Sequence, residues 1–171
     1  METIENRVDK SPLITIDLET YYPDGMRSTI DIASWLHEGL ILREKEFRAY
    51  VQAHTWQDYQ GHFVALTCST EAIIPSWAYL LVTTQLTGVA TKVIVGNLEL
   101  LEVVIFQEII ANLPLEAYRD KPVIIKGCTH KPIPISASVM LVSKLQPVVK
   151  SLMFGEACST VPLFKNRKKV L

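Results

Sequence analysis

The stretch Val123–Cys128, which reads VIIKGC, decides the fold that this sequence predicts. An earlier stretch, Val64–Cys68, reads VALTC and resembles it. Each is an apolar run that ends in a cysteine, as expected for a strand that is buried on both faces of a parallel sheet. Both cysteines would then follow the carboxyl ends of strands, where open α/β sheets place their ligand sites.

The composition is that of a compact globular protein. Of the 171 residues, 49% are hydrophobic and 20% are charged, so the chain can bury a sizeable core in a single domain. With a net charge of −1, the chain as a whole lacks the excess positive charge that binds nucleic acid or an anionic membrane. There is no secretory signal and no apolar run long enough to span a bilayer, so we expect a cytoplasmic protein. The sequence does not identify a binding partner, and it is consistent with either a monomer or a homo-oligomer.

Residues 62–164 are predicted to form a duplicated α/β core, in which each half contains a strand, a cysteine, a proline, a helix and a second strand. Matching Cys68 with Cys128 requires an offset of 60 positions, whereas Pro75 and Pro134 match at 59, so aligning the halves requires one deletion. A helix over residues 98–112 joins the halves. Strands are expected near residues 63–67, 92–96, 122–127 and 150–154, adjacent in one mostly parallel sheet with helices on both faces.

Residues 1–61 are predicted to form an extension of this core. Residues 13–18 and 28–32 alternate apolar and polar side chains, and we expect them to pair as an antiparallel β-hairpin, followed by a helix over about residues 43–54. The hairpin could bring Asp17, Asp31 and Glu38 together as an acid pair, but we expect them to be solvated surface carboxylates. Residues 165–171 form a basic terminal tail.

Three runs of residues resemble those of a known family. They are Glu38–Lys45, Ile74–Tyr79 and Phe154–Pro162. The chain resembles an uncharacterised family of short bacterial proteins, a domain of unknown function, over nearly its whole length. The resemblance implies one intact domain, but no activity and no site residue.

The main functional hypothesis concerns the three cysteines, Cys68, Cys128 and Cys158. If the strands share one sheet, all three thiols follow strand ends at one edge and converge. Three thiolates would suit zinc or an iron–sulfur cluster, and His130 or Glu156 would be the candidate fourth ligand. The prediction is therefore a metal-binding protein of unknown activity.

Two alternatives stay open beside the metal site. The first is a thiol-dependent enzyme, with Cys68 or Cys128 as the nucleophile and His130 as its base. The second is a non-enzymatic interaction domain in which the cysteines fill the core and tryptophans furnish a contact surface. The glycines are isolated and form neither a dinucleotide fingerprint nor a P-loop, so no nucleotide is predicted.

Overall fold

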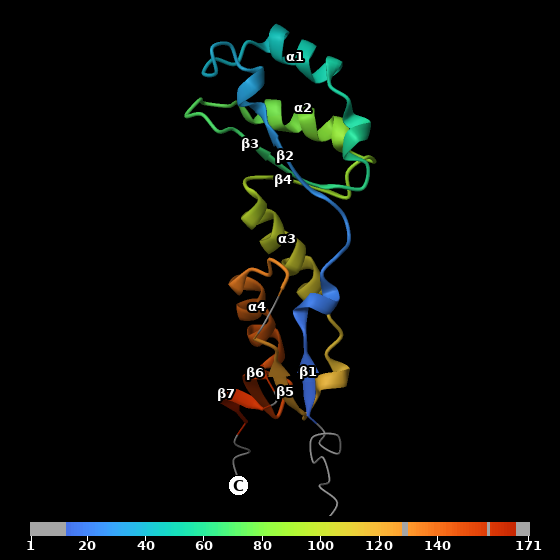
Figure 1. Ribbon diagram of the computed structural model, residues 1–171, viewed down its shortest axis with the longest axis vertical. Coiled ribbons are helices and arrows are strands. Elements are labelled where there is room, and N and C mark those ends of the chain that lie inside the picture. The colour runs from blue at the N-terminus through green and yellow to red at the C-terminus, as the bar shows by residue number, and fades with distance from the viewer. Residues whose placement is uncertain (1–12, 128–129, 157, 167–171) are drawn as a thin grey trace, which may run out of the picture. The chain divides into compact units, whose positions relative to one another are not determined.

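The computed structural model describes residues 13–127, 130–156 and 158–166, and over these residues four α-helices and seven β-strands build a mixed α/β fold (Figure 1). Six of the strands pair in parallel, so the predicted fold class is confirmed. The chain divides into two compact units. Unit 1 comprises Met1–Tyr22 and Glu102–Leu171, and unit 2 comprises Pro23–Leu101.

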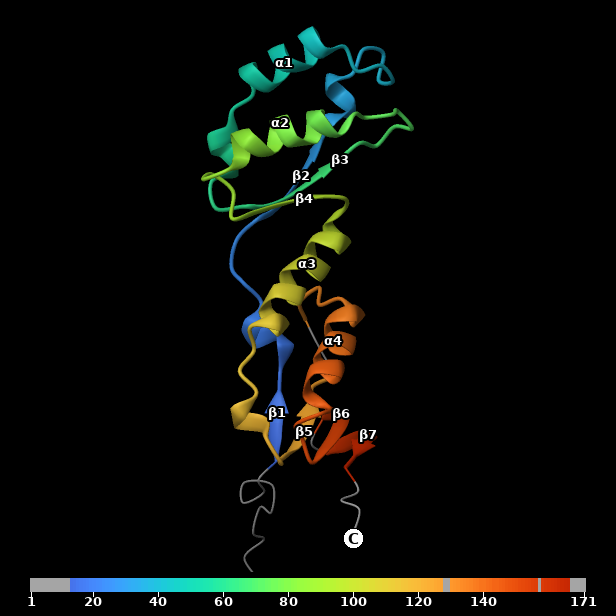
Figure 2. The ribbon, with the colours of Figure 1, turned by 180° about the vertical axis from the view of Figure 1, so that it is seen from behind.

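Unit 2 contains a three-stranded parallel sheet in the order β2-β3-β4. Its elements are β2 (Arg27–Asp31), α1 (Glu44–Ala53), β3 (Phe63–Thr67), α2 (Ser76–Leu86) and β4 (Lys92–Val95). The central strand β3 is buried at four consecutive residues, Phe63–Leu66, which explains its unbroken apolar sequence. In Figures 1 and 2, α2 covers this sheet and α1 lies on the outer side of α2.

Unit 1 contains a four-stranded sheet in the order β1-β5-β6-β7. Its elements are β1 (Ile14–Ile16), α3 (Leu98–Ala111, in this unit from Glu102), β5 (Pro122–Ile125), α4 (Ile135–Leu145), β6 (Ser151–Glu156) and β7 (Ser159–Lys165). The strand β7 pairs with β6 in antiparallel orientation. Lys144 of α4 donates hydrogen bonds of 2.6 Å to the carbonyls of Ile110 and Ala111, so it satisfies the carboxyl end of α3.

Two predictions about strand pairing are wrong. The strands β1 and β2 do not form a hairpin, because β1 pairs in parallel with β5 and β2 pairs in parallel with β3. The predicted strands also do not share one sheet, since β3 and β4 belong to unit 2 whereas β5 and β6 belong to unit 1. Alternation of apolar and polar residues shows that a short strand has one buried face. It does not determine which other strand pairs with it.

These pairings reveal the same edge strand in both sheets. Residues 15–17 and 29–31 both read Thr-Ile-Asp. The isoleucine of the first motif pairs with Ile125 of β5, and that of the second pairs with Leu66 of β3. The similarity between the two sheets therefore extends to an edge strand, in addition to the predicted strand–helix–strand unit.

The structure is compatible with a duplication and simplifies its alignment. Leu66 and Ile125 occupy equivalent positions, and the offset between them is 59, the same as between the two prolines. The deletion expected from the sequence is not needed. Cys68 then matches Gly127 and not Cys128, so the cysteines are not the equivalent residues of the two halves.

The helices α2 and α4 begin in the same way and bury side chains at the same spacing. Each follows a proline at its N-cap, and each buries three side chains at intervals of one turn. These are Ala78, Val82 and Leu86 in α2, and Ala137, Leu141 and Leu145 in α4. Each set belongs to the core of its own unit. Among the described helices, none is both long and apolar enough to cross a bilayer.

Candidate functional site

The predicted metal-binding function is wrong. Among the described residues, no group of three or more histidine, cysteine, aspartate or glutamate side chains could hold a metal ion. The prediction assumed that the strands end at one edge of one sheet, but Cys68 belongs to unit 2 and Cys158 to unit 1. Cys128 lies outside the described residues. Cys158 is exposed in the turn between β6 and β7, and Cys68 is a free, half-buried thiol.

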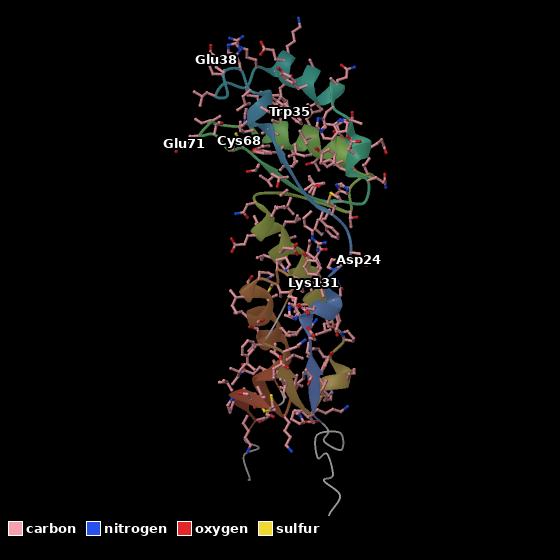
Figure 3. The ribbon with its side chains drawn as sticks, in the orientation of Figure 1. Asp24, Trp35, Glu38, Cys68, Glu71 and Lys131 are labelled. Atoms are coloured by element: carbon pink, nitrogen blue, oxygen red, sulfur yellow. The ribbon has the colours of Figure 1, made fainter. Side chains whose placement is uncertain are left out.

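Cys68 instead packs against the core of unit 2, as a small apolar side chain does. Its sulfur lies 3.3 Å from the hydroxyl oxygen of Thr70, on the loop that joins β3 to α2. Figure 3 labels Cys68 and, on the same loop, Glu71. The three tryptophans expected to furnish a contact surface also pack into this core: Trp35 is 9% exposed, and Trp56 and Trp77 are partly buried.

Asp31 organises the carboxyl edge of the sheet in unit 2. One of its carboxylate oxygens accepts hydrogen bonds of 3.0 Å from the backbone amides of both Ala33 and Ser69. The Ser69 hydroxyl and these amides lower the pKa of Asp31, although burial opposes the shift. This aspartate is therefore not a freely solvated carboxylate, because it ties the end of β2 to the loop after β3.

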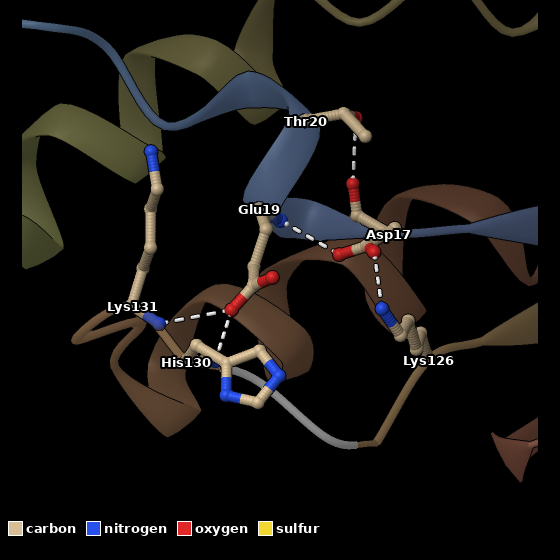
Figure 4. Close-up of polar contacts among 6 residues, drawn as sticks. All are labelled: Asp17, Glu19, Thr20, Lys126, His130 and Lys131. Atoms are coloured by element: carbon tan, nitrogen blue, oxygen red, sulfur yellow. Dashed lines mark hydrogen bonds and ion pairs between the residues drawn. The ribbon is translucent and has the colours of Figure 1, made fainter.

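Asp17 holds the equivalent position in unit 1, but its partner is a charged side chain. A carboxylate oxygen of Asp17 lies 2.6 Å from Nζ of Lys126, which directly follows β5 (Figure 4). The two side chains are only 23% and 28% exposed, respectively. Burial alone would raise the pKa of Asp17, but the hydrogen bonds from Lys126 and from the Glu19 amide outweigh it and lower the pKa.

Glu19 joins the same edge of unit 1 to the loop before α4. One of its carboxylate oxygens accepts hydrogen bonds from the backbone amides of His130 and Lys131, the latter at 2.9 Å (Figure 4). These amides lower the pKa of Glu19, so the carboxylate stays ionised at neutral pH. His130, a predicted site residue, is exposed and contributes its backbone amide to this contact.

Glu156, the second candidate fourth ligand, lies at the end of β6. Its Oε1 is buried and has no hydrogen-bond partner among the described residues. The hydrogen bond to Asp17 raises the pKa of Lys126, and the negative charges of Glu156 and Glu19 add to that shift. We call Asp17, Glu19, Lys126 and Glu156 the carboxyl-edge cluster of unit 1.

Two glycines allow the strand ends at this edge to approach closely. A Cβ added to Gly127 would lie 3.1 Å from the ring of Phe154 and 3.4 Å from the Cα of Gly155. Gly155 itself has a φ of +123°, which side-chain-bearing residues rarely adopt. The absence of both side chains lets the backbone that follows Lys126 lie against the end of β6.

An open apolar groove of about 390 Å³ lies between α4 and the strands of unit 1. Serines 138 and 143 are the polar residues of its lining. The apolar lining consists of Ile125, Ile135, Val139, Val142, Phe154 and Leu163. Of these, Ile135 is 75% exposed, Val139 59% and Leu163 49%, so the α4 groove presents apolar side chains to its surroundings.

Residues of the α4 groove and of the carboxyl-edge cluster follow one another in the sequence at the ends of β5 and β6. Ile125 lines the groove and the next residue, Lys126, forms the ion pair. Phe154 lines the groove and Glu156 follows two residues later. The strands that line the apolar groove therefore also carry charged residues near their carboxyl ends, and small-molecule sites usually combine an apolar lining with a few polar groups.

Sequence reasoning missed both the ion pair and the groove. The repeated Thr-Ile-Asp motif was the available signal, because the same short motif before two similar loops indicates a shared role for the aspartate. The partner of Asp17 could not be found in this way, since it depends on β1 pairing with β5. The groove likewise depends on β7, which the pattern does not predict because Pro162 interrupts it.

The comparisons with known proteins point to a family but not to an activity. Neither a curated protein nor a solved structure matches this chain. A family model matches residues 2–166, which is nearly the whole length, and it confirms the resemblance found in the sequence. The chain therefore belongs to the family described as "Protein of unknown function (DUF2480)".

Proposed function

We propose that unit 1 binds a small molecule whose apolar part occupies the α4 groove and whose polar part meets the carboxyl-edge cluster. The observation that supports this function best is that residues of the two features follow one another on the same two strands. Ile125 and Phe154 line the groove, while Lys126 and Glu156 follow them on the same two strands. An apolar pocket beside a few convergent polar groups is the general form of a ligand site.

Size and location support the same proposal. A volume of about 390 Å³ lies within the range of roughly 300 to 1,000 Å³ that is common for small-molecule pockets. The groove also reaches the carboxyl ends of the parallel strands, which is where open α/β sheets bind their ligands. The exposed side chains of Ile135 and Val139 would lose their contact with water when a ligand binds.

The proposal predicts that a polar side chain in the groove weakens binding of an apolar probe. Val139→Gln places an amide among the apolar lining residues, and we expect it to reduce the affinity for the neutral dye Nile red about five- to tenfold. Leu80→Gln is the matched control, because Leu80 is the equivalent residue of α2 and is similarly exposed, at 64% against 59% for Val139.

The dye is titrated against each full-length variant and its fluorescence is recorded, after circular dichroism has shown equal helix content. The proposal requires that Leu80→Gln leaves the affinity within about twofold of the unmodified chain. Equal losses in both variants, or no loss in Val139→Gln, would show that the dye does not bind in the α4 groove and would contradict the proposal.

A further inference from the structure

The exposed apolar side chains of unit 1 gather on two elements. In the described part of this unit, the large hydrophobic side chains that are exposed lie on α4 and β7, with Tyr21 as the exception. Ile135 and Val139 of α4 are 75% and 59% exposed, and Val161 and Leu163 of β7 are 60% and 49% exposed. We call these four residues the α4–β7 face.

The two elements present these side chains on the same side of the sheet. Leu163 lines the α4 groove together with residues of α4. Val161 is paired with Phe154, which also lines the groove. Directly opposed residues of neighbouring strands point their side chains to the same face of a sheet, so Val161 lies on the groove side as well. The α4–β7 face is therefore one patch around the groove, whereas scattered single apolar side chains would need no explanation.

The charges on these two elements indicate what kind of partner can cover the face. Lys144 is the charged residue of α4, and its ammonium group is bound to the carboxyl end of α3. Lys165 is the charged residue of β7 and lies at the end of the strand. A symmetric contact places the same patch on both partners, so a charged patch would repel its own copy, whereas this face would not. Nucleic acid would instead require a cluster of basic side chains.

Pro162 restricts the way in which a partner can approach. It lies within β7, which is an edge strand of the sheet in unit 1. Proline has no backbone N–H to donate to another strand, so an edge that contains it is a poor template for extending the sheet. A partner is therefore expected to pack side chains against the face and not to add a strand to β7.

The size of the face is sufficient for a weak dimer. Its four side chains together expose roughly 400 Å². Two copies packed face to face would bury roughly 800 Å² from these residues, and contact with Ser138, Val142 and Ser143 of the groove would bring the total to about 1,000 Å². That area is the lower limit for a specific interface between proteins, so we expect a dimer that dissociates on dilution.

We propose that the α4–β7 face is the contact between two copies of this chain, packed about a two-fold axis. The contact goes beyond the proposed function, because it requires no ligand. Partner and ligand would both cover Ile135 and Val139, but Val161 belongs to the face and not to the lining of the groove. At the low protein concentration of a dye titration the chain is monomeric, so the two proposals are tested separately.

Sedimentation velocity of the full-length protein at about 5 to 300 μM tests the proposal. A reducing agent is present, because Cys158 is exposed and could link two copies through a disulfide. We expect a reversible monomer–dimer equilibrium with a Kd on the order of 10 to 100 μM. Val161→Lys should weaken the dimer at least about tenfold, because it places an ammonium group in an apolar contact. Val139→Lys, on α4, should act in the same direction.

Val95→Lys is the matched control, since Val95 is a valine of the edge strand β4 in unit 2 and is 52% exposed, against 60% for Val161. It should leave the Kd within about twofold of the unmodified chain. Circular dichroism shows that each variant is folded.

Three results would overturn the proposal. A chain that stays monomeric over the whole concentration range would show that the α4–β7 face has another occupant. A dimer that persists in either folded variant, Val161→Lys or Val139→Lys, would place the contact elsewhere. A dimer that only Val95→Lys dissociates would assign the contact to unit 2. None of these results alters the dye test of the α4 groove, so the proposed function can stand or fail independently.

Discussion

A single carboxylate at the end of an edge strand shows how one residue can order a loop. Asp31 accepts two backbone hydrogen bonds, from Ala33 and from Ser69, and these connect β2 to the loop after β3. The pKa of Asp31 is lowered by the Ser69 hydroxyl and by these amides. Its ionised form therefore stabilises the fold, and that stabilisation is complete only at a pH above the ordinary carboxyl pKa of about 4.

The lowered pKa of Asp31 predicts the direction of a pH effect. As the pH falls through the lowered pKa, the carboxylate takes up a proton and its contribution to the free energy of unfolding is lost. Asp31→Asn should cost about 1 kcal/mol at pH 7 and should flatten the dependence of stability on pH between about pH 5 and 2. Urea unfolding followed by circular dichroism at several pH values measures both effects.

Asp24→Asn is the control for this prediction, because it replaces an exposed carboxylate of the same unit. It should leave both the free energy of unfolding at pH 7 and its slope with pH nearly unchanged. A slope that is as steep in Asp31→Asn as in the unmodified chain would show that the Asp31 carboxylate contributes nothing to acid stability.

Among the elements, the pair of strands β6 and β7 depends on one backbone conformation. Gly155 has a φ of +123°, and a Cβ at this residue would lie 2.5 Å from the carbonyl oxygen of Ser159. That oxygen belongs to the first residue of β7, so it cannot move without disturbing the pairing of the two strands. β7 in turn provides Leu163 to the α4 groove.

Gly155→Ala should therefore lower the free energy of unfolding by about 2 to 4 kcal/mol, through a backbone clash added to an unfavourable φ. Gly88→Ala serves as the control, because Gly88 has a φ of +81° but a Cβ there would meet nothing within 4 Å. We expect it to cost about 1 kcal/mol. Guanidinium unfolding of both variants compares these costs, and equal values would mean that the clash at Ser159 is relieved without loss.

For the molecule as a whole, two separate hydrophobic cores predict that core mutations act locally. Leu86 belongs to the core of unit 2 and its equivalent, Leu145, to the core of unit 1, and both are fully buried. Either leucine-to-alanine change should cost about 2 to 5 kcal/mol in its own unit. All three tryptophans lie in unit 2, so tryptophan fluorescence reports the unfolding of that unit.

Leu86→Ala should therefore shift the unfolding transition seen by fluorescence more than Leu145→Ala does. Circular dichroism, which detects the helices of both units, should register both changes. Chemical unfolding of the two variants, followed by both signals, makes the comparison. Identical shifts in the fluorescence transition would show that the two cores unfold as one cooperative system.

Much of this fold was determined by local properties of the sequence. The apolar runs at β3 and β5 specify strands that are buried on both faces, and Pro75 and Pro134 specify where α2 and α4 begin. Such features can be predicted because they depend on the burial pattern and the backbone geometry of a few adjacent residues. The spacing of 59 residues between Pro75 and Pro134 could be found in the sequence for the same reason.

The tertiary structure alone decided which strands pair, and with them the candidate site. The edge strands β1 and β2 look alike in sequence, yet each adds to a different sheet. Cys68 and Cys158 therefore follow strands of two different sheets. The ion pair between Asp17 and Lys126 joins residues 109 positions apart. Contacts of this kind follow from the packing of the whole core, because side-chain alternation orients the buried face of a strand without selecting its neighbour.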